Sequence, residues 1–274
     1  MEGQMSKFFI LLLLFAGSLQ AQMHVLVSIA PQKYLVERIG GDQVFVEVIV
    51  PPGANSHTYE PTTKQMLAAQ KGQIWFRIGE SFENRMLSVL RDTHILDQRE
   101  GIELIQAGCG CCTHDAHDPH IWLSPRLLKV QAAQIAQTLC EHDPAHAELF
   151  QKNLAILEEE CACLDLACAA DFLKSQQKLI LVSHPAFGYF CRDYGLEQLS
   201  IEMEGREPTP RYVTELIIKA RARGVRTVFL QQQHNPKGGN RIAHELGAKT
   251  TYIDPYVENV LANIRNISQR FSQP

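Results

Sequence analysis

The chain has 274 residues, of which 45% are hydrophobic and 20% are charged, and its 26 basic and 30 acidic side chains give a formal net charge of -4. These proportions are typical of a globular protein and exclude a disordered or collagen-like chain. Because no run of five or six basic residues occurs, the sequence does not indicate a nucleic-acid-binding surface. The length suggests about two domains. The unusual features are 8 cysteines and 11 histidines.

The amino terminus has the pattern of an export signal. Lys7 precedes an apolar run over residues 8–16, and small residues follow as far as Ala21. A basic start, a short apolar segment and a small residue at the cleavage point are typical of a secretory signal peptide. A membrane-spanning helix needs about 20 apolar residues, which is about twice this run. We therefore expect residues 1–21 to be removed near Ala21 and the mature protein to be exported and not membrane-spanning.

Short apolar or β-branched runs alternate with helical patterns along the rest of the chain. The runs that predict strands are residues 24–29, 44–50, 74–78, 178–182, 227–230 and 249–253. The segments that predict helices are residues 33–39, a helix from about residue 62, another from about residue 125, and residues 212–222 and 240–246. Strands that alternate with helices indicate βαβ units with parallel sheets. Because this order occurs twice, we predict two parallel-sheet α/β lobes.

A long helical segment separates the two sets of strands. Residues 144–174 contain no glycine and a single proline, and their apolar residues recur at helical spacing. This pattern predicts a helix of about 25 to 30 residues at about 1.5 Å per residue. Its length alone also fits a packing helix within one domain. We interpret it as the connection between an amino-terminal lobe at 22–143 and a carboxy-terminal lobe at 175–274.

Candidate metal ligands follow the predicted strands. His57 and His184 lie shortly after strands, Asp254 follows a strand directly, and His120 lies just before a helix that begins near Pro125. Ligands of open α/β sheets bind at the carboxyl ends of the strands, so polar residues at these positions are candidates. Three neutral imidazoles and one carboxylate suit a divalent transition metal.

Four motifs resemble those of a known receptor family. They are SHTYEP at 56–61, DPHIWL at 118–123, SHPAFGYF at 183–190 and EPTP at 207–210. In this order they resemble the zinc and manganese receptors of bacterial ABC importers, the ZnuA-like solute-binding proteins. The resemblance implies a periplasmic receptor with two α/β lobes, one long rigid connecting helix and a metal site in the cleft between the lobes. Such a receptor delivers its ion to a membrane permease.

The resemblance also implies which residues bind the metal. His57 and His120 match the two ligands of the amino-terminal lobe, and His184 matches the third position, where manganese-type members have a glutamate. The match to the family is weaker at the fourth position, because the loop after the last predicted strand is shorter than in the family. We expect Asp254 there, with Glu258 or a water molecule as alternatives.

A segment rich in cysteine and histidine lies between the first two motifs. Its candidate ligands are Cys109, Cys111, Cys112, His114 and His117. Thiolate and imidazole both suit zinc, so this segment could capture an ion and pass it to His120. Because exported cysteines are usually paired, a disulfide is an equally good interpretation. His234 and His244 lie in or beside a polar loop, and we expect them to bind nothing.

The resulting prediction is a monomeric metal receptor, with Zn2+ favoured by three nitrogen ligands and nearby thiols. Mn2+ or Fe2+ could use the same three histidines together with Asp254, and this alternative stays open. A zinc-dependent hydrolase is the rival, because three histidines can leave a coordination position for a reactive water. Glu60 would be its general base, but no catalytic motif supports this. An adhesin that binds metal incidentally would share the same scaffold.

Overall fold

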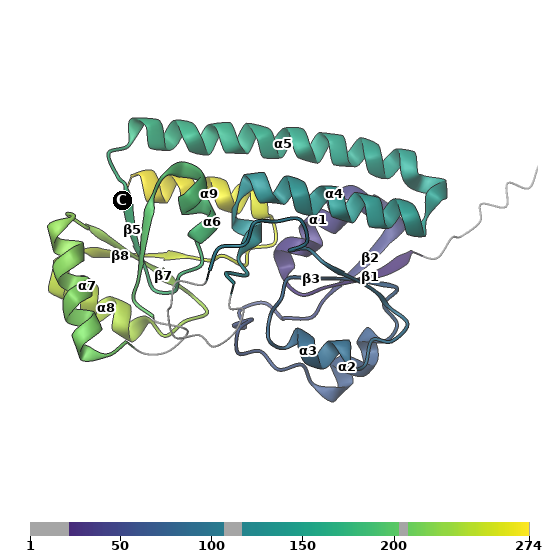
Figure 1. Ribbon diagram of the computed structural model, residues 1–274, viewed down its shortest axis with the longest axis horizontal. Coiled ribbons are helices and arrows are strands. Elements are labelled where there is room, and N and C mark those ends of the chain that lie inside the picture. The colour runs from purple at the N-terminus through teal and green to yellow at the C-terminus, as the bar shows by residue number, and fades with distance from the viewer. Residues whose placement is uncertain (1–21, 107–116, 203–207, 274) are drawn as a thin grey trace, which may run out of the picture.

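The computed structural model describes residues 22–106, 117–202 and 208–273, which form two lobes that each contain a four-stranded parallel sheet (Figure 1). The first sheet has the order β2-β1-β3-β4 and is made of β1 (Met23–Val27), β2 (Val44–Val48), β3 (Ile74–Arg77) and β4 (His94–Asp97). The second has the order β6-β5-β7-β8 and is made of β5 (Leu179–Val182), β6 (Glu197–Ser200), β7 (Thr227–Gln231) and β8 (Lys249–Ile253). All neighbouring strands pair in parallel, which confirms the predicted fold class.

Two of these strands were not predicted. β4 (HILD) and β6 (EQLS) each have four residues and lie at a sheet edge, where most of their side chains stay partly exposed. Apolar runs identify strands that are covered on both faces, so edge strands with polar side chains give a weak signal in the sequence.

The helices begin at recognisable signals. They are α1 (Ala30–Gly40), α2 (Thr63–Ala69), α3 (Glu83–Leu87), α4 (Pro125–His142), α5 (Ala147–Lys174), α6 (Gly188–Tyr194), α7 (Pro210–Ala222), α8 (Pro236–Leu246) and α9 (Val260–Ser272). The hydroxyl groups of Thr62, Ser124 and Thr209 accept hydrogen bonds from the first turns of α2, α4 and α7. A side-chain acceptor at this position satisfies a backbone N–H that has no partner within the helix. None of the helices in the described ranges is both long and apolar enough to cross a membrane.

α5 is the long helix predicted between the lobes, and it runs across the top of both in Figure 1. Its 28 residues correspond to about 42 Å at 1.5 Å per residue. It begins at Ala147, because Pro144–His146 form a 3-10 turn after α4. One side of α5 packs on α1 and α4 of the first lobe, and its later part packs on α6 and α9. The helix therefore contacts both lobes along its length.

The core is divided unequally between the two faces of the second sheet. One apolar cluster runs from the first sheet through α4, α5 and α9 to residues of β5 and β7, so it spans both lobes. A smaller cluster fills the space between the second sheet and α7 and α8. Trp122 is completely buried in the larger cluster, and its Nε1 donates a hydrogen bond to the carbonyl oxygen of Pro255 at 2.9 Å. The lobes are thus joined by a shared core as well as by the connecting helix.

Candidate metal centre

Three histidines from separate segments converge between the lobes. His57 follows β2, His120 precedes the short 3-10 helix before α4, and His184 follows β5. One ring nitrogen of each lies within 4.8 Å of one ring nitrogen of the other two. The Nε2 atoms of His57 and His184 are 3.0 Å apart, and the ring centroids of His120 and His184 are 5.3 Å apart. The structure therefore brings together the three histidines that the sequence selected.

His57 is oriented by a buried carboxylate. Its Nδ1 lies 3.0 Å from Oε2 of Glu80, whose side chain is 2% exposed. The other carboxylate oxygen accepts a hydrogen bond of 2.6 Å from the hydroxyl of Ser56, to which Tyr256 of the second lobe contributes a further hydrogen bond of 2.8 Å. Burial lowers the pKa of His57, but the hydrogen bond and charge of Glu80 outweigh burial and raise it. His57 is therefore held in place, and it binds a proton more readily than an ordinary histidine.

His120 is the most buried of the three, and it is held by its own motif. Its Nδ1 lies 2.6 Å from Oδ1 of Asp118, which also accepts the backbone N–H of His120 at 2.9 Å. The Nε2 atom is buried and has no hydrogen-bond partner among the described residues. A buried polar atom without a partner is costly, so this nitrogen faces a position that suits a cation.

The second lobe helps to hold Asp118. The Tyr189 hydroxyl donates to the carbonyl oxygen of Asp118 at 2.8 Å. Gly188, at the start of α6, lies so close that a Cβ atom there would be 2.6 Å from Oδ2 of Asp118. A glycine is therefore required at this position by close approach.

His184 is fixed through both its backbone and its ring. Gln231, at the end of β7, accepts the His184 N–H at 2.7 Å and donates to the His184 carbonyl oxygen at 2.8 Å. The Nδ1 atom lies 3.2 Å from Oε2 of Glu202. Burial is the main reason that the pKa of His184 falls to about 3, with the nearby charges of His120 and His57 lowering it further against the opposing effect of Glu202. His184 is therefore neutral, and its Nε2 lies 3.0 Å from Nε2 of His57.

The three imidazoles share one arrangement. In each, Nδ1 lies within hydrogen-bond distance of a carboxylate oxygen. This contact favours the tautomer with the proton on Nδ1, whose Nε2 lone pair is available for a metal. Carboxylates that hold histidine ligands in this way are common around zinc. The donor set consequently fits a divalent transition metal.

Asp254 and Glu258 lie elsewhere. Oδ1 of Asp254 accepts hydrogen bonds from Nε2 of Gln233 and from the backbone N–H of Tyr256, both at 2.8 Å. Both carboxylates line a separate cavity of about 230 Å3, and Glu258 pairs with Lys33 at 2.9 Å. Within the described residues, neither belongs to the group of ligand atoms that the three histidines form. The structure thus does not bring Asp254 to the histidines, and its role as fourth ligand stays a prediction.

The segment rich in cysteine and histidine is described only at its end. Cys109, Cys111, Cys112 and His114 lie outside the described residues, as do the predicted signal peptide and Glu207 of the EPTP motif. The backbone of His117 pairs with that of Gln106 in an antiparallel bridge. The metal-binding interpretation and the disulfide interpretation of the cysteines both stay predictions.

Several functional positions were not predicted from the sequence. Glu80, Glu202 and Gln231 lie at or just after the ends of β3, β6 and β7, which is the signal that selected the histidines. His234 was expected to bind nothing, but its ring stacks on that of His184 with centroids 4.4 Å apart. Its Nδ1 also contacts Glu202 at 2.9 Å. These residues could have been selected by extending the search for polar residues at strand ends to glutamate and glutamine.

Two α/β lobes, a long helix across both and converging histidines between them define a metal-binding receptor of the bilobed type. The chain matches the family described as zinc-uptake complex component A, periplasmic, over residues 25–266, and it belongs to this family. Members of this family are metal-binding transport receptors and not enzymes, so the hydrolase alternative is wrong.

Similar proteins carry related descriptions. A putative metal-binding protein of Chlamydia muridarum is 34% identical over 252 residues, which are 92% of this chain and 91% of the relative. The iron-binding protein YfeA of Yersinia pestis is 28% identical over 233 residues, 80% of this chain and 74% of that protein. The crystal structure of a ZnuA deletion mutant with zinc bound superimposes with a TM-score of 0.86 at 35% identity, and the match covers 92% of this chain and 97% of that chain. The similar proteins thus include one described with zinc and one described as iron-binding.

Proposed function

We propose that this protein is an extracytoplasmic receptor that captures a divalent transition metal, above all zinc, and delivers it to the permease of an ABC importer. The observation that supports this most directly is the convergence of one ring nitrogen from each of three imidazoles, together with the Nε2 atom of His120, which is buried without a hydrogen-bond partner in the described part of the chain. His57 and His120 come from one lobe and His184 from the other, so relative movement of the lobes would separate the ligands during release. The periplasm is the proposed compartment, with residues 1–21 as the signal peptide.

Zinc is favoured over manganese by the chemistry of the three ligands. Zinc binds imidazole readily and accepts four-coordinate geometry, whereas manganese prefers oxygen ligands. A fourth ligand from Asp254 would require this side chain to leave Gln233 and the Tyr256 N–H, which it contacts at 2.8 Å. A water molecule completes the site without that cost. Iron, which the relative from Yersinia pestis is described as binding, is the second candidate ion.

A zinc titration of the chelated mature protein tests the main site. We expect about one zinc to bind tightly, and His57→Ala, His120→Ala and His184→Ala each to weaken binding strongly because each removes a ligand. His244→Ala is the matched control, because His244 is an exposed histidine near the end of α8. If all three variants titrate like the wild-type protein, the proposed metal site is wrong. Competition with manganese and iron in the same assay ranks the ions.

The segment from Cys109 to His117 is proposed as an accessory capture site. His117 lies only three residues before His120 in the sequence, so an ion held there would be close along the chain to the main site. Deletion of residues 109–117 should lower the total zinc stoichiometry and leave the affinity of the main site unchanged. An unchanged stoichiometry would remove the accessory site and favour the disulfide.

A further inference from the structure

A second group of possible metal ligands includes His184 and lies on the Nδ1 side of its ring. It consists of His184, Glu202 and His234, whose ligand atoms all lie within 4.8 Å of one another. The Nδ1 atom of His234 is 3.0 Å from Oε1 and 2.9 Å from Oε2 of Glu202, while Nδ1 of His184 is 3.2 Å from Oε2. The two rings stack with an interplanar angle of 19°. Both Nδ1 atoms therefore point at the same carboxylate.

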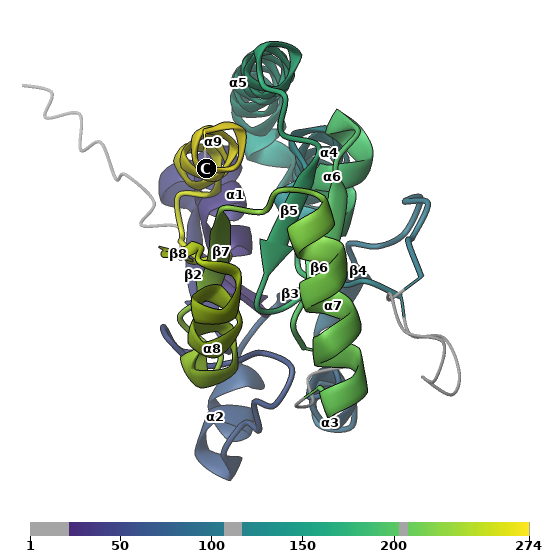
Figure 2. The same ribbon diagram turned by 90° about the vertical axis from the view of Figure 1, so that its left-hand side faces the viewer.

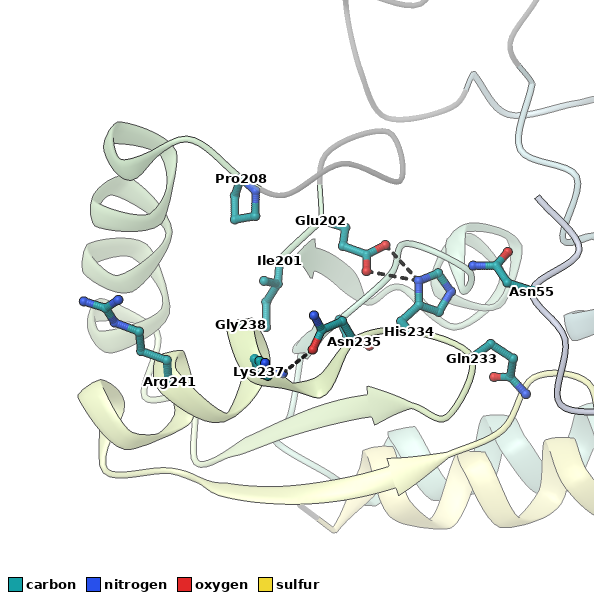
Figure 3. A pocket seen from close by; sticks show the side chains of 12 residues that line it. Asn55, Ile201, Glu202, Pro208, Gln233, His234, Asn235, Lys237, Gly238 and Arg241 are labelled. Carbon is teal, nitrogen blue, oxygen red and sulfur yellow. Dashed lines mark hydrogen bonds and ion pairs between the residues drawn. The ribbon is translucent and has the colours of Figure 1, made fainter. Parts of the chain in front are cut away.

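This group, which we call the shared-histidine site, borders solvent on one side. Glu202 and His234 line a cavity of about 500 Å3 together with Ser183 and with Asn55 of the first lobe (Figure 3). Figure 3 also shows Arg241 on the far side of the cavity from Asn55 and His234. An ion that enters this cavity from solvent can thus reach the carboxylate of Glu202, which lies on the Nδ1 side of the His184 ring, whereas the three-histidine site lies on its Nε2 side.

A purely supporting role for this group does not account for His234. Glu80 orients His57, and Asp118 orients His120, without a second imidazole on either carboxylate among the described residues. Glu202 alone could do the same for His184. The side chain of His234 is nevertheless only 6% exposed and stacks on His184, which adds a third possible ligand where positioning needs only the carboxylate.

We propose that His184, Glu202 and His234 form a second site for a divalent transition metal, which receives the ion from the cavity and passes it to the three-histidine site through His184. Two nitrogens and one carboxylate oxygen form a ligand set that suits zinc. The second site follows from the geometry alone, and only the direction of transfer depends on the receptor function proposed above.

The chemistry of imidazole makes the two sites exclusive. A neutral imidazole has one nitrogen with a free lone pair and one nitrogen with a proton. An ion on Nδ1 of His184 leaves the proton on Nε2, which lies 3.0 Å from Nε2 of His57. An ion on Nε2 leaves the proton on Nδ1, where Glu202 accepts it at 3.2 Å. When the ion moves from Nδ1 to Nε2, Nε2 releases its proton to solvent and Nδ1 takes up one proton from solvent. His184 therefore stays neutral.

The binding claim is tested with Co2+, whose visible absorption reports its ligands, in a variant that lacks the first site. The double variant His57→Ala/His120→Ala should bind one Co2+ through the shared-histidine site. Addition of His234→Ala should weaken this binding at least 10-fold, while addition of His244→Ala should not change it. Circular dichroism confirms that the variants are folded. The proposal of a second site would be overturned if the folded double variant did not bind Co2+, or if His234→Ala did not weaken the binding.

The transfer claim is tested in the otherwise wild-type chain, where folding is not at risk. Stopped-flow loading with zinc can use the fluorescence of Trp122, whose ring centroid is 5.1 Å from that of His120. His234→Ala should slow loading about 10-fold and change the equilibrium dissociation constant less than 3-fold. A supporting role would instead weaken affinity without slowing loading, and that result would overturn the transfer. Failure of the receptor function would appear separately, as zinc binding that does not depend on His57 and His120.

Discussion

The two halves of the metal centre are built differently. In the amino-terminal lobe, His57 and His120 each have a carboxylate partner at Nδ1, which leaves the Nε2 atom of each ring for the centre. In the carboxy-terminal lobe, one carboxylate contacts two stacked histidines, so His184 has possible metal positions on both sides of its ring. The first half offers a fixed pair of ligands, whereas the second offers a ligand that two positions can share. Variants that affect one half but not the other test this difference.

The largest effect should come from His184→Ala, because this residue belongs to both positions. Loss of a partner that holds a ligand costs roughly 10- to 100-fold in metal affinity, and loss of the shared ligand should cost more than this. Isothermal titration calorimetry with zinc measures the change. His234→Ala should leave most of the affinity, so equal losses in the two variants would contradict the division between the halves.

Removal of the carboxylates in the amino-terminal half should have the next largest effect. Asp118→Asn and Glu80→Gln should each weaken zinc binding by roughly 10- to 100-fold, because the histidines lose the charged partner that fixes their tautomer. Glu60→Gln is the control, since the Glu60 side chain is 62% exposed and pairs with Arg85. Zinc titrations of the three variants compare them directly. Wild-type affinity in both Asp118→Asn and Glu80→Gln would show that the carboxylates do not support the site.

The pH dependence of zinc binding should follow from His57. Its pKa is raised because the hydrogen bond and charge of Glu80 outweigh burial, so a proton competes with zinc already above the ordinary histidine value of about 6.5. Affinity should therefore fall as the pH drops, by up to about 10-fold per pH unit for one displaced proton. Dissociation constants measured between about pH 5.5 and pH 8.5 test this prediction.

Glu80→Gln sharpens the pH experiment. The neutral side chain lacks the charge that raises the pKa of His57, so the loss of affinity should begin at a lower pH than in the wild-type protein. An identical pH profile in both proteins would show that His57 is not the residue where the proton competes.

A smaller effect is expected where the second lobe supports the first. A Cβ atom at Gly188 would lie 2.6 Å from Oδ2 of Asp118, so Gly188→Ala should displace that carboxylate and disturb His120. We expect zinc affinity to fall several-fold and the free energy of unfolding to fall by about 1 to 3 kcal/mol. At Gly238, another helical glycine, the nearest atom would be 3.9 Å away, so Gly238→Ala is the matched control for affinity. Equal zinc affinity in both variants would contradict the support of Asp118 by α6.

Much of the fold could be predicted because buried strands and long helices leave strong patterns. The runs at β1, β5 and β7 are almost fully buried, and α5 buries residues at helical spacing, such as Leu157, Cys161 and Cys168. The edge strands β4 and β6 lack these patterns. Their position depends on pairing with β3 and β5, from which they are separated by α3 and α6.

The candidate site was predictable to the extent that strand ends and motifs selected His57, His120 and His184. What the sequence could not supply is the direction of each side chain. Asp254 follows β8 as directly as expected, yet its carboxylate binds Gln233 and the Tyr256 backbone. His234 is in the polar loop where it was expected, yet its ring turns inward to His184. Side-chain direction in loops depends on tertiary contacts that spacing along the chain does not encode.

The small apolar cluster beneath α7 and α8 has a consequence for how the protein moves. Because this cluster is separate from the core that spans both lobes, we expect these two helices to open locally more readily than the larger core and α5. α8 supplies Lys237 and Arg241 to the cavity beside Glu202 and His234 (Figure 2 shows α7 and α8 below α5 and α9). Local opening of this subregion would expose that side of the cavity to solvent.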